Sequence, residues 1–391
     1  MISICGLGRG MRSLHTPEDF RLAARRRLPK GLFDFIDRGT EGEFALDRSR
    51  RAYDEMTLMP RALIDVSRRH VSIDLFGKKM AMPLAIAPTG AAGLLWHQGE
   101  IELARAARAE GIPFSVATGA ITSLEEIAEK AGGRLWFQLY MWPDRSLSHE
   151  LVHRAEAAGY EALIVTVDTV VTPNRSYNAR NGFSIPMKAN RRVVADLARR
   201  PGWLFGVMAR YMLAGGMPRH ENYPAALRVP ITAGVVANPK NETLDWADLM
   251  QLRRLWKGPM IVKGILHPAD ARRAVDCGAD GLIVSNHGGR NFDSAPAPLA
   301  ILPPIVDVVN NRAAVMIDGG ICRGSDIAKA LALGATCALA GRLPLWGLAA
   351  GGEAGVARVL AMFREDLSRT LAFVGVTDPS SLRGVDRGIS E

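Results

Sequence analysis

The chain has few cysteines and no long apolar run. Its 391 residues include only Cys5, Cys277, Cys322 and Cys337, which form no CxxC pair and lie near no histidine at the spacing of a zinc site. No stretch approaches the roughly 18 uninterrupted apolar residues of a membrane-spanning helix. The sequence therefore argues against a disulfide scaffold, a metal centre and a transmembrane protein, and it predicts a reduced, cytoplasmic one.

Acidic residues are fewer than basic ones, 40 against 49, which gives a formal net charge of +9. Such a charge suits nucleic acid, an anionic membrane surface or an acidic substrate. A nucleic-acid partner is disfavoured, because the basic residues outside 188–230 are scattered over helix faces and do not form a patch with interleaved aromatics. The hydrophobic content of 48% and charged content of 23% are those of an ordinary globular protein.

Short apolar runs rich in β-formers alternate with segments of helical periodicity. Helices are expected at 99–111, 123–132, 148–159, 267–278 and 324–334, and several of these segments end in glycine. Eight strands are expected at 83–87, 113–117, 135–140, 162–168, 259–263, 281–286, 313–318 and 336–341. Eight such units with nearly continuous apolar strands predict an α/β fold, a parallel (β/α)8 TIM barrel.

Some segments fall outside this rhythm. Residues 1–13 are read as a flexible N-terminus, and 14–60 as N-terminal helices that begin after a Thr16 cap. The barrel domain is expected to span 14–376, with a C-terminal tail at 377–391. An insertion at 173–240, after the fourth strand, is far longer than an ordinary βα loop.

Within the insertion, residues 188–230 combine eight basic residues with only two acidic ones and many large apolar side chains. Basic and apolar residues together favour contact with an anionic membrane surface. A solvated or oligomer-facing loop is the open alternative. If the segment does dock, the protein is peripheral on the inner face of the cell membrane.

Polar residues recur where the predicted strands end, which is where barrel enzymes build their active sites. The glycine-rich segments "IDGGICRG" (317–324) and "LAGRLP" (339–344) follow strands seven and eight, where barrels commonly bind phosphate. The candidate residues at the strand ends are Thr89, Thr118, Gln138, Tyr140, Thr166, Asp168, Lys263, Ser285, His287, Arg290, Asp318, Gly320, Arg323, Gly341 and Arg342.

Part of this set suits a flavin. Lys263 can stabilise the region of the ring that becomes anionic on reduction, and Gln138 and Thr166 can supply neutral hydrogen bonds to the ring edge. A flavin is favoured over nicotinamide because the chain contains no dinucleotide fingerprint.

A second part suits an acidic substrate. His287 can act as a general base near neutral pH, with Asp168 to orient its ring. Arg290 and Arg175 can grip a carboxylate with their planar forks. A base, a carboxylate clamp and a flavin together indicate oxidation at the carbon next to a carboxylate.

The same residues carry a resemblance over nearly the whole chain, from "RLPKGLFDF" (27–35) to about residue 376. The chain resembles the FMN-dependent L-2-hydroxy acid dehydrogenase and oxidase family, which includes mandelate dehydrogenase, L-lactate dehydrogenase and glycolate oxidase. The motifs that carry it are "FQLY" (137–140), "TVD" (166–168), "VKG" (262–264), "SNHGGR" (285–290), "DGG" (318–320), "LALGA" (331–335) and "AGR" (340–342).

The resemblance implies oxidation of an L-2-hydroxy acid to the 2-keto acid, with FMN reoxidised by a quinone, a cytochrome or oxygen, in a homotetramer. It implies that His287 is the base, that Asp168 is its partner, and that Arg290 and Arg175 bind the carboxylate. Tyr140 is implied near the substrate hydroxyl. The implied FMN contacts are Thr89, Gln138, Thr166, Lys263, Ser285, Asp318 and Arg342.

Two positions depart from the family pattern. Phe35 stands where the family usually has a tyrosine that contacts the substrate carboxylate, a loss of roughly 1.5 to 3 kcal/mol if nothing compensates. Cys322 stands where an arginine at the phosphate is common. The motifs favour a mandelate-like or lactate-like substrate. An oxygen-using oxidase, a flavin barrel for a different substrate, and a protein left catalytically weak by Phe35 stay open as alternatives.

Overall fold

The computed structural model of the chain describes residues 13–183, 190–233 and 241–389. At its centre is a closed parallel barrel with the strand order β10-β11-β4-β5-β6-β7-β8-β9. The barrel strands are β4 (Leu84–Ile86), β5 (Phe114–Ala117), β6 (Leu135–Leu139), β7 (Ala162–Thr166), β8 (Met260–Ile265), β9 (Gly281–Val284), β10 (Ala314–Ile317) and β11 (Cys337–Ala340). The predicted (β/α)8 barrel is confirmed, and each predicted strand segment supplies one barrel strand. Nearly every residue of these strands is buried, because helices cover the outer face and side chains fill the interior.

The interior of the barrel is closed at the N-terminal ends of its strands. The hairpin of β2 (Ile73–Leu75) and β3 (Lys78–Met80) packs Leu75 and Met80 against the inward-facing side chains of the barrel. At the hairpin turn, the ring of Phe76 meets that of Trp136 edge-on, with centroids 6.2 Å apart. With this end plugged, ligands can reach the barrel only from the C-terminal ends of the strands.

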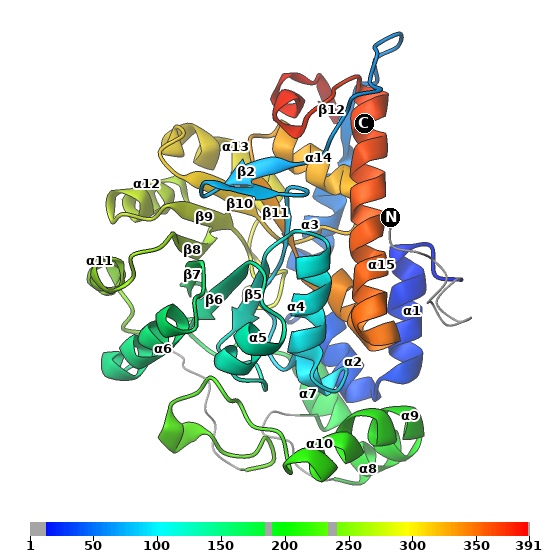
Figure 1. Cartoon of the computed structure of the whole chain (residues 1–391), viewed down its shortest axis with the longest axis vertical. Helices are drawn as coiled ribbons and strands as arrows, with labels where there is room; N and C mark the ends of the chain where they lie inside the picture. Colours follow the sequence, from blue (N-terminus) through cyan, green and yellow to red (C-terminus); the bar gives the residue numbers. More distant parts are fainter. Residues whose placement is uncertain (1–12, 184–189, 234–240, 390–391) are drawn as a thin grey trace.

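Helices surround the barrel, and the predicted helical segments are all present (Figure 1). The long α15 bends at Gly351 and Gly352, whose backbone angles are not helical. The sequence analysis did not propose α13, which contains Pro303 and Pro304 and so resembles a broken helix. The helices are α4 (Gly99–Ala109), α5 (Leu124–Lys130), α6 (Arg145–Ala157), α11 (Trp246–Leu255), α12 (Pro268–Asp276), α13 (Pro298–Val309), α14 (Gly324–Ala332) and α15 (Arg342–Val374), with the short η2 (Ala92–Leu94) after β4.

Three N-terminal helices precede the barrel: α1 (Pro17–Arg27), α2 (Lys30–Asp37) and α3 (Phe44–Glu55). Thr16 caps α1 as predicted, in a capping box with Asp19. Helix α1 runs beside α15 in Figure 1, and α2 and α3 bring their ends to the barrel mouth. The segment expected as a C-terminal tail holds η5 (Pro379–Gly384) and β12 (Arg387–Ile389), which pairs with β1 (Met56–Leu58).

The described part of the insertion is largely helical. It contains α7 (Ser176–Asn181), α8 (Arg191–Ala198), α9 (Pro201–Trp203), a π-helical turn η3 (Leu204–Met208), α10 (Ala209–Ala214) and η4 (Ala225–Leu227). Helices α8 to α10 lie together at one end of the molecule, close to α7 (Figure 1). Trp203 Nε1 donates to the carbonyl of Leu94 at 2.7 Å, and the Tyr211 hydroxyl accepts from the amide of Gln98 at 2.9 Å. These bonds fasten the insertion to the segment that follows β4. Lys188, one of the eight basic residues of 188–230, lies outside the described residues.

Candidate active site

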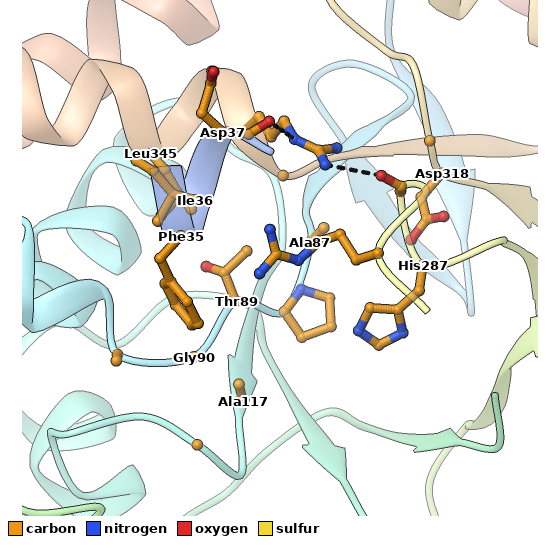
Figure 2. A pocket seen from close by; sticks show the side chains of 18 of the residues that line it. Phe35, Ile36, Asp37, Ala87, Thr89, Gly90, Ala117, His287, Asp318 and Leu345 are labelled. Carbon is orange, nitrogen blue, oxygen red and sulfur yellow. Dashed lines mark hydrogen bonds between the residues drawn. The ribbon is translucent and has the colours of Figure 1, made fainter. Parts of the chain in front are cut away.

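A cavity of about 1010 Å³ lies at the C-terminal ends of the barrel strands. Figure 2 shows Phe35 and His287 on opposite sides of the view, with Thr89 and Ala87 between them. Most of the predicted site residues line this cavity: Thr89, Gln138, Tyr140, Arg175, Lys263, His287, Arg290, Asp318, Gly320, Arg323, Gly341 and Arg342. The other four predicted residues each form a hydrogen bond with a residue that lines the cavity: Thr118, Thr166, Asp168 and Ser285.

His287 is oriented by Asp168. Its Nδ1 lies 3.0 Å from one carboxylate oxygen and 3.2 Å from the other, so Nδ1 carries the proton and Nε2 presents a lone pair. Burial lowers the pKa of His287, and although Asp168 opposes this effect, the ring stays below its usual value. Burial would raise the pKa of Asp168, but the attraction of His287 and Lys263 holds it below its usual value. The pair therefore combines a neutral imidazole with a carboxylate.

Local backbone geometry makes this pairing possible. His287 itself has a φ of +58°, an uncommon conformation for a side chain with a Cβ, and its amide donates to Ser285 Oγ at 3.0 Å. Gly264 has a φ of +106°, and a Cβ there would lie 2.6 Å from the Cβ of Asp168. The glycine of the "VKG" motif is required for Asp168 to reach His287.

Lys263 is a buried cation at the floor of the cavity. Its Nζ donates to Ser285 Oγ at 2.9 Å and lies 3.1 Å from an Asp318 carboxylate oxygen. Burial works to lower the pKa of Lys263, but Asp318 and Asp168 outweigh it and raise the pKa above its usual value. The ammonium group is therefore charged, and Ser285 connects it to the backbone of His287.

Several cavity-lining residues have a buried oxygen without a hydrogen-bond partner in the part of the chain that the structure describes, and two of these oxygens belong to predicted FMN contacts. They are Thr89 Oγ1 and Asp318 Oδ1. Buried polar atoms are rarely left unpaired, so each points to a ligand with polar groups. Gly341 leaves further room, since a Cβ there would meet nothing closer than 3.8 Å.

Gln138 is held by its neighbours on two strands. Its side-chain Nε2 donates to Thr166 Oγ1 at 3.0 Å, and its backbone carbonyl accepts from Thr118 Oγ1 at 2.6 Å. The Thr118 oxygen also accepts from the amide of Tyr140 at 3.1 Å, which occupies it between β5 and β6. Thr118 thus serves to position Gln138 and Tyr140, a role that strand-end position alone does not reveal.

Three arginines line the cavity and form no ion pair with a carboxylate in the described part of the chain. Arg175 donates to the backbone carbonyl of Arg290 through Nε at 3.3 Å and Nη2 at 3.2 Å. Arg290 Nη1 in turn donates to the backbone carbonyl of Arg38 at 2.9 Å. Burial, followed by repulsion from Arg290, lowers the pKa of Arg175 to about 10 and that of Arg342 to about 10. Such a cluster is a strong site for an anion.

Phe35 contacts this cluster through its ring. The guanidinium of Arg290 lies over the Phe35 ring, 5.3 Å from its centroid. The Phe183 ring packs against the Phe35 ring, with centroids 5.7 Å apart. The cation–π contact orients Arg290. Phe35 therefore offers the anion site an apolar wall in place of a hydroxyl.

The loop after β10 is built by a residue that the sequence analysis missed. Arg50 from α3 donates to the carbonyl of Gly320 at 2.5 Å and forms an ion pair of 2.7 Å with buried Asp326. Asp326 in turn accepts from the amides of Cys322 and Arg323, each at 2.9 Å. These two amides are already used, so the Arg323 side chain is the better candidate for a phosphate. No sequence signal linked Arg50, some 270 residues away, to this loop.

Arg342 is directed away from that loop. Its Nε donates to the carbonyl of Asp37 at 2.9 Å, and its Nη2 donates to that of Gly288 at 2.9 Å. It therefore ties α2 to the turn that carries His287.

A further wall of the cavity comes from residues 220–233 of the insertion, among which the sequence analysis proposed no site residue. Its members are His220, Tyr223, Leu227, Val229, Pro230, Ile231 and Ala233. The stretch "GMPRHENYP" (216–224) contains two prolines, one histidine and one tyrosine, and nothing in it indicates which side chains face inward.

Residues 24–386 match the family model of the FMN-dependent dehydrogenases. The chain belongs to this family. It is an FMN-dependent oxidoreductase that acts on CH–OH groups, as the sequence analysis predicted.

Relatives with assigned activities cover the chain almost completely. (S)-Mandelate dehydrogenase from Pseudomonas putida is 39% identical over 372 residues, 95% of this chain and 93% of that protein. L-Lactate dehydrogenase from Caulobacter vibrioides is 40% identical over 366 residues, 93% of this chain and 95% of the relative. The crystal structure of the monotopic membrane protein (S)-mandelate dehydrogenase matches with a TM-score of 0.88 and 39% identity, covering 95% of this chain and 98% of that one.

Proposed function

We propose that the protein oxidises a mandelate-like or lactate-like L-2-hydroxy acid to the 2-keto acid. One observation carries the proposal: a neutral histidine oriented by a carboxylate faces the same cavity as the arginine cluster. A general base and an anion clamp on one cavity suit a substrate whose reacting carbon is bonded to a carboxylate.

Several polar groups of the cavity would hold FMN. Thr89 and Asp318 offer unpaired oxygens, Lys263 a buried positive charge and Gln138 an oriented amide. Arg323 is our candidate for the phosphate, and Gly341 leaves room in the cavity. Bound FMN would accept the two electrons removed from the substrate.

The protein side chains would handle the proton and the charge. His287 Nε2 takes up a proton that leaves the substrate, and Asp168 stabilises the imidazolium that results. Arg175 and Arg290 hold the carboxylate, and Tyr140 lies near the hydroxyl. The pKa of Tyr140 is raised by burial and by Asp168, so the phenol stays protonated as a donor.

Anaerobic mixing tests this function. We expect L-mandelate or L-lactate to bleach the yellow flavin of the holoenzyme, with the matching D-isomers and acetate as controls. Bleaching by an amino acid or another substrate class, with none by any L-2-hydroxy acid, would overturn the proposal in favour of the alternative flavin-barrel function. Weak bleaching that needs very high substrate concentrations would favour the alternative of a catalytically weak protein, in which Phe35 lacks the hydroxyl that would bind the substrate carboxylate.

We also propose that the insertion places the enzyme on an anionic membrane surface, where a quinone accepts the electrons. Val194, Phe205 and Leu213 expose 58%, 70% and 89% of their surface, and Arg199 and Arg210 are exposed between them in the sequence. Exposed apolar and basic groups on adjoining helices are the features of an interfacial element. In the described residues, no helix has the length and apolar character needed to cross a bilayer. The related monotopic mandelate dehydrogenase supports this proposal.

Vesicle flotation tests the membrane contact. We expect the holoenzyme to float with vesicles that contain phosphatidylglycerol at low salt, and the Phe205→Ser/Leu213→Ser variant to stay in solution. Phe373→Ser is the matched control, because Phe373 is 66% exposed near the end of α15, away from the insertion. Wild-type protein that never floats would contradict the proposal and favour a cytoplasmic homotetramer, with a cytochrome or oxygen as the acceptor.

A further inference from the structure

His220 is a partly buried histidine in the cavity wall, separate from the His287 pair. Its Nδ1 lies 3.0 Å from the carbonyl oxygen of Gly119, and its ring stacks on that of Tyr223 with centroids 4.6 Å apart. Both residues come from the insertion, whereas Gly119 follows β5. The contact therefore pins the insertion wall against the barrel mouth.

The hydrogen bond to Gly119 determines which nitrogen of His220 can accept a hydrogen bond from a ligand. A carbonyl only accepts, so Nδ1 must carry the hydrogen. Burial lowers the pKa of His220, so the ring is neutral near pH 7 and its Nε2 holds a lone pair. Nε2 is thus a hydrogen-bond acceptor on a side chain that lines the cavity.

The other described residues of this wall are apolar or aromatic. Tyr223 packs edge-on against Trp142 at 5.2 Å, and Leu227, Val229 and Ile231 line the same wall. Trp142 lies two residues after Tyr140, which lines the same cavity, so this wall adjoins the segment that carries Tyr140. One acceptor in an apolar wall beside the reacting group is a typical arrangement for recognising a specific side chain.

We propose that His220 Nε2 accepts a hydrogen bond from a donor group on the side chain of the substrate. The preferred substrates are then L-2-hydroxy acids with a flat apolar side chain that carries a hydroxyl or N–H, such as a ring-hydroxylated aryl group. This inference rests on the proposed function, since it assigns the side-chain pocket of the same site.

Binding of non-reacting keto acids tests it directly. Phenylglyoxylate and its 3- and 4-hydroxy derivatives are titrated into the oxidised holoenzyme, and the flavin absorbance reports the dissociation constants. We expect one hydroxylated derivative to bind roughly 3- to 10-fold more tightly than the parent, the range of one neutral hydrogen bond. In His220→Leu this preference should vanish, and in His220→Gln, whose amide oxygen can stand in for Nε2, it should return in part.

The outcomes separate this inference from the proposed function. Tyr223→Phe is the matched control: loss of the preference there, with retention in His220→Leu, would overturn the assignment. Equal binding of all three keto acids to the wild type would also overturn it. Flavin bleaching by L-mandelate decides the function independently, and retained flavin absorbance shows that each variant is folded.

Discussion

Replacement of His287 by alanine is expected to lower the rate of flavin reduction by an L-2-hydroxy acid about 10²- to 10⁴-fold, the usual contribution of a general base. FMN should stay bound, because the His287 ring is hydrogen-bonded to Asp168. Anaerobic stopped-flow absorbance measures the rate, and flavin retention after gel filtration measures binding.

His153→Ala is the control for this experiment, since its side chain is 61% exposed on α6. Fast flavin reduction in His287→Ala would show that another group takes up the proton. Loss of FMN from the variant would instead make His287 a structural residue of the cofactor site.

The Asp168→Asn variant is expected to lose a similar factor and also to change its pH dependence. Asp168 raises the pKa of His287 against the effect of burial, so removal of the carboxylate charge lowers that pKa further. The neutral, active form of His287 then persists to lower pH, and the acidic limb of the rate profile moves to lower pH. The maximum rate falls, because the imidazolium is less stabilised.

The pH profile of flavin reduction, measured anaerobically, distinguishes this role from a structural one. Asp307→Asn, an exposed carboxylate on α13, should leave both the rate and the profile unchanged. An acidic limb that stays in place, or moves to higher pH, would contradict the assignment of Asp168 as the partner of His287.

The barrel could be predicted because its signals are local. Each strand is a short apolar run, and each of several following helices ends at a glycine, so the repeat is visible without any tertiary contact. The strand ends then locate the site, because parallel strands in a barrel all end at the same rim. His287, Lys263 and Asp318 were proposed from position in this way, and all three line the cavity.

The contacts that complete the site are long-range and could not be predicted. Arg50 reaches the loop at Gly320, and Arg342 turns toward the carbonyl of Asp37. The insertion shows the same limit: its composition indicated a surface element, yet Trp203 is buried and His220 lines the cavity. Composition reports which side chains are present and not which face of a helix or loop they occupy.

By itself the sequence determined the eightfold alternation, the chemical types at the barrel mouth and the family motifs, since all of these are written in local order. Only the tertiary structure decided which nitrogen of His287 is free to take up a proton and which nitrogen of His220 is free to accept a hydrogen bond. That choice depends on the oxygen facing the other nitrogen, from Asp168 in one case and Gly119 in the other. In both cases the two partners come from separate segments of the chain, and only folding brings them within hydrogen-bond distance.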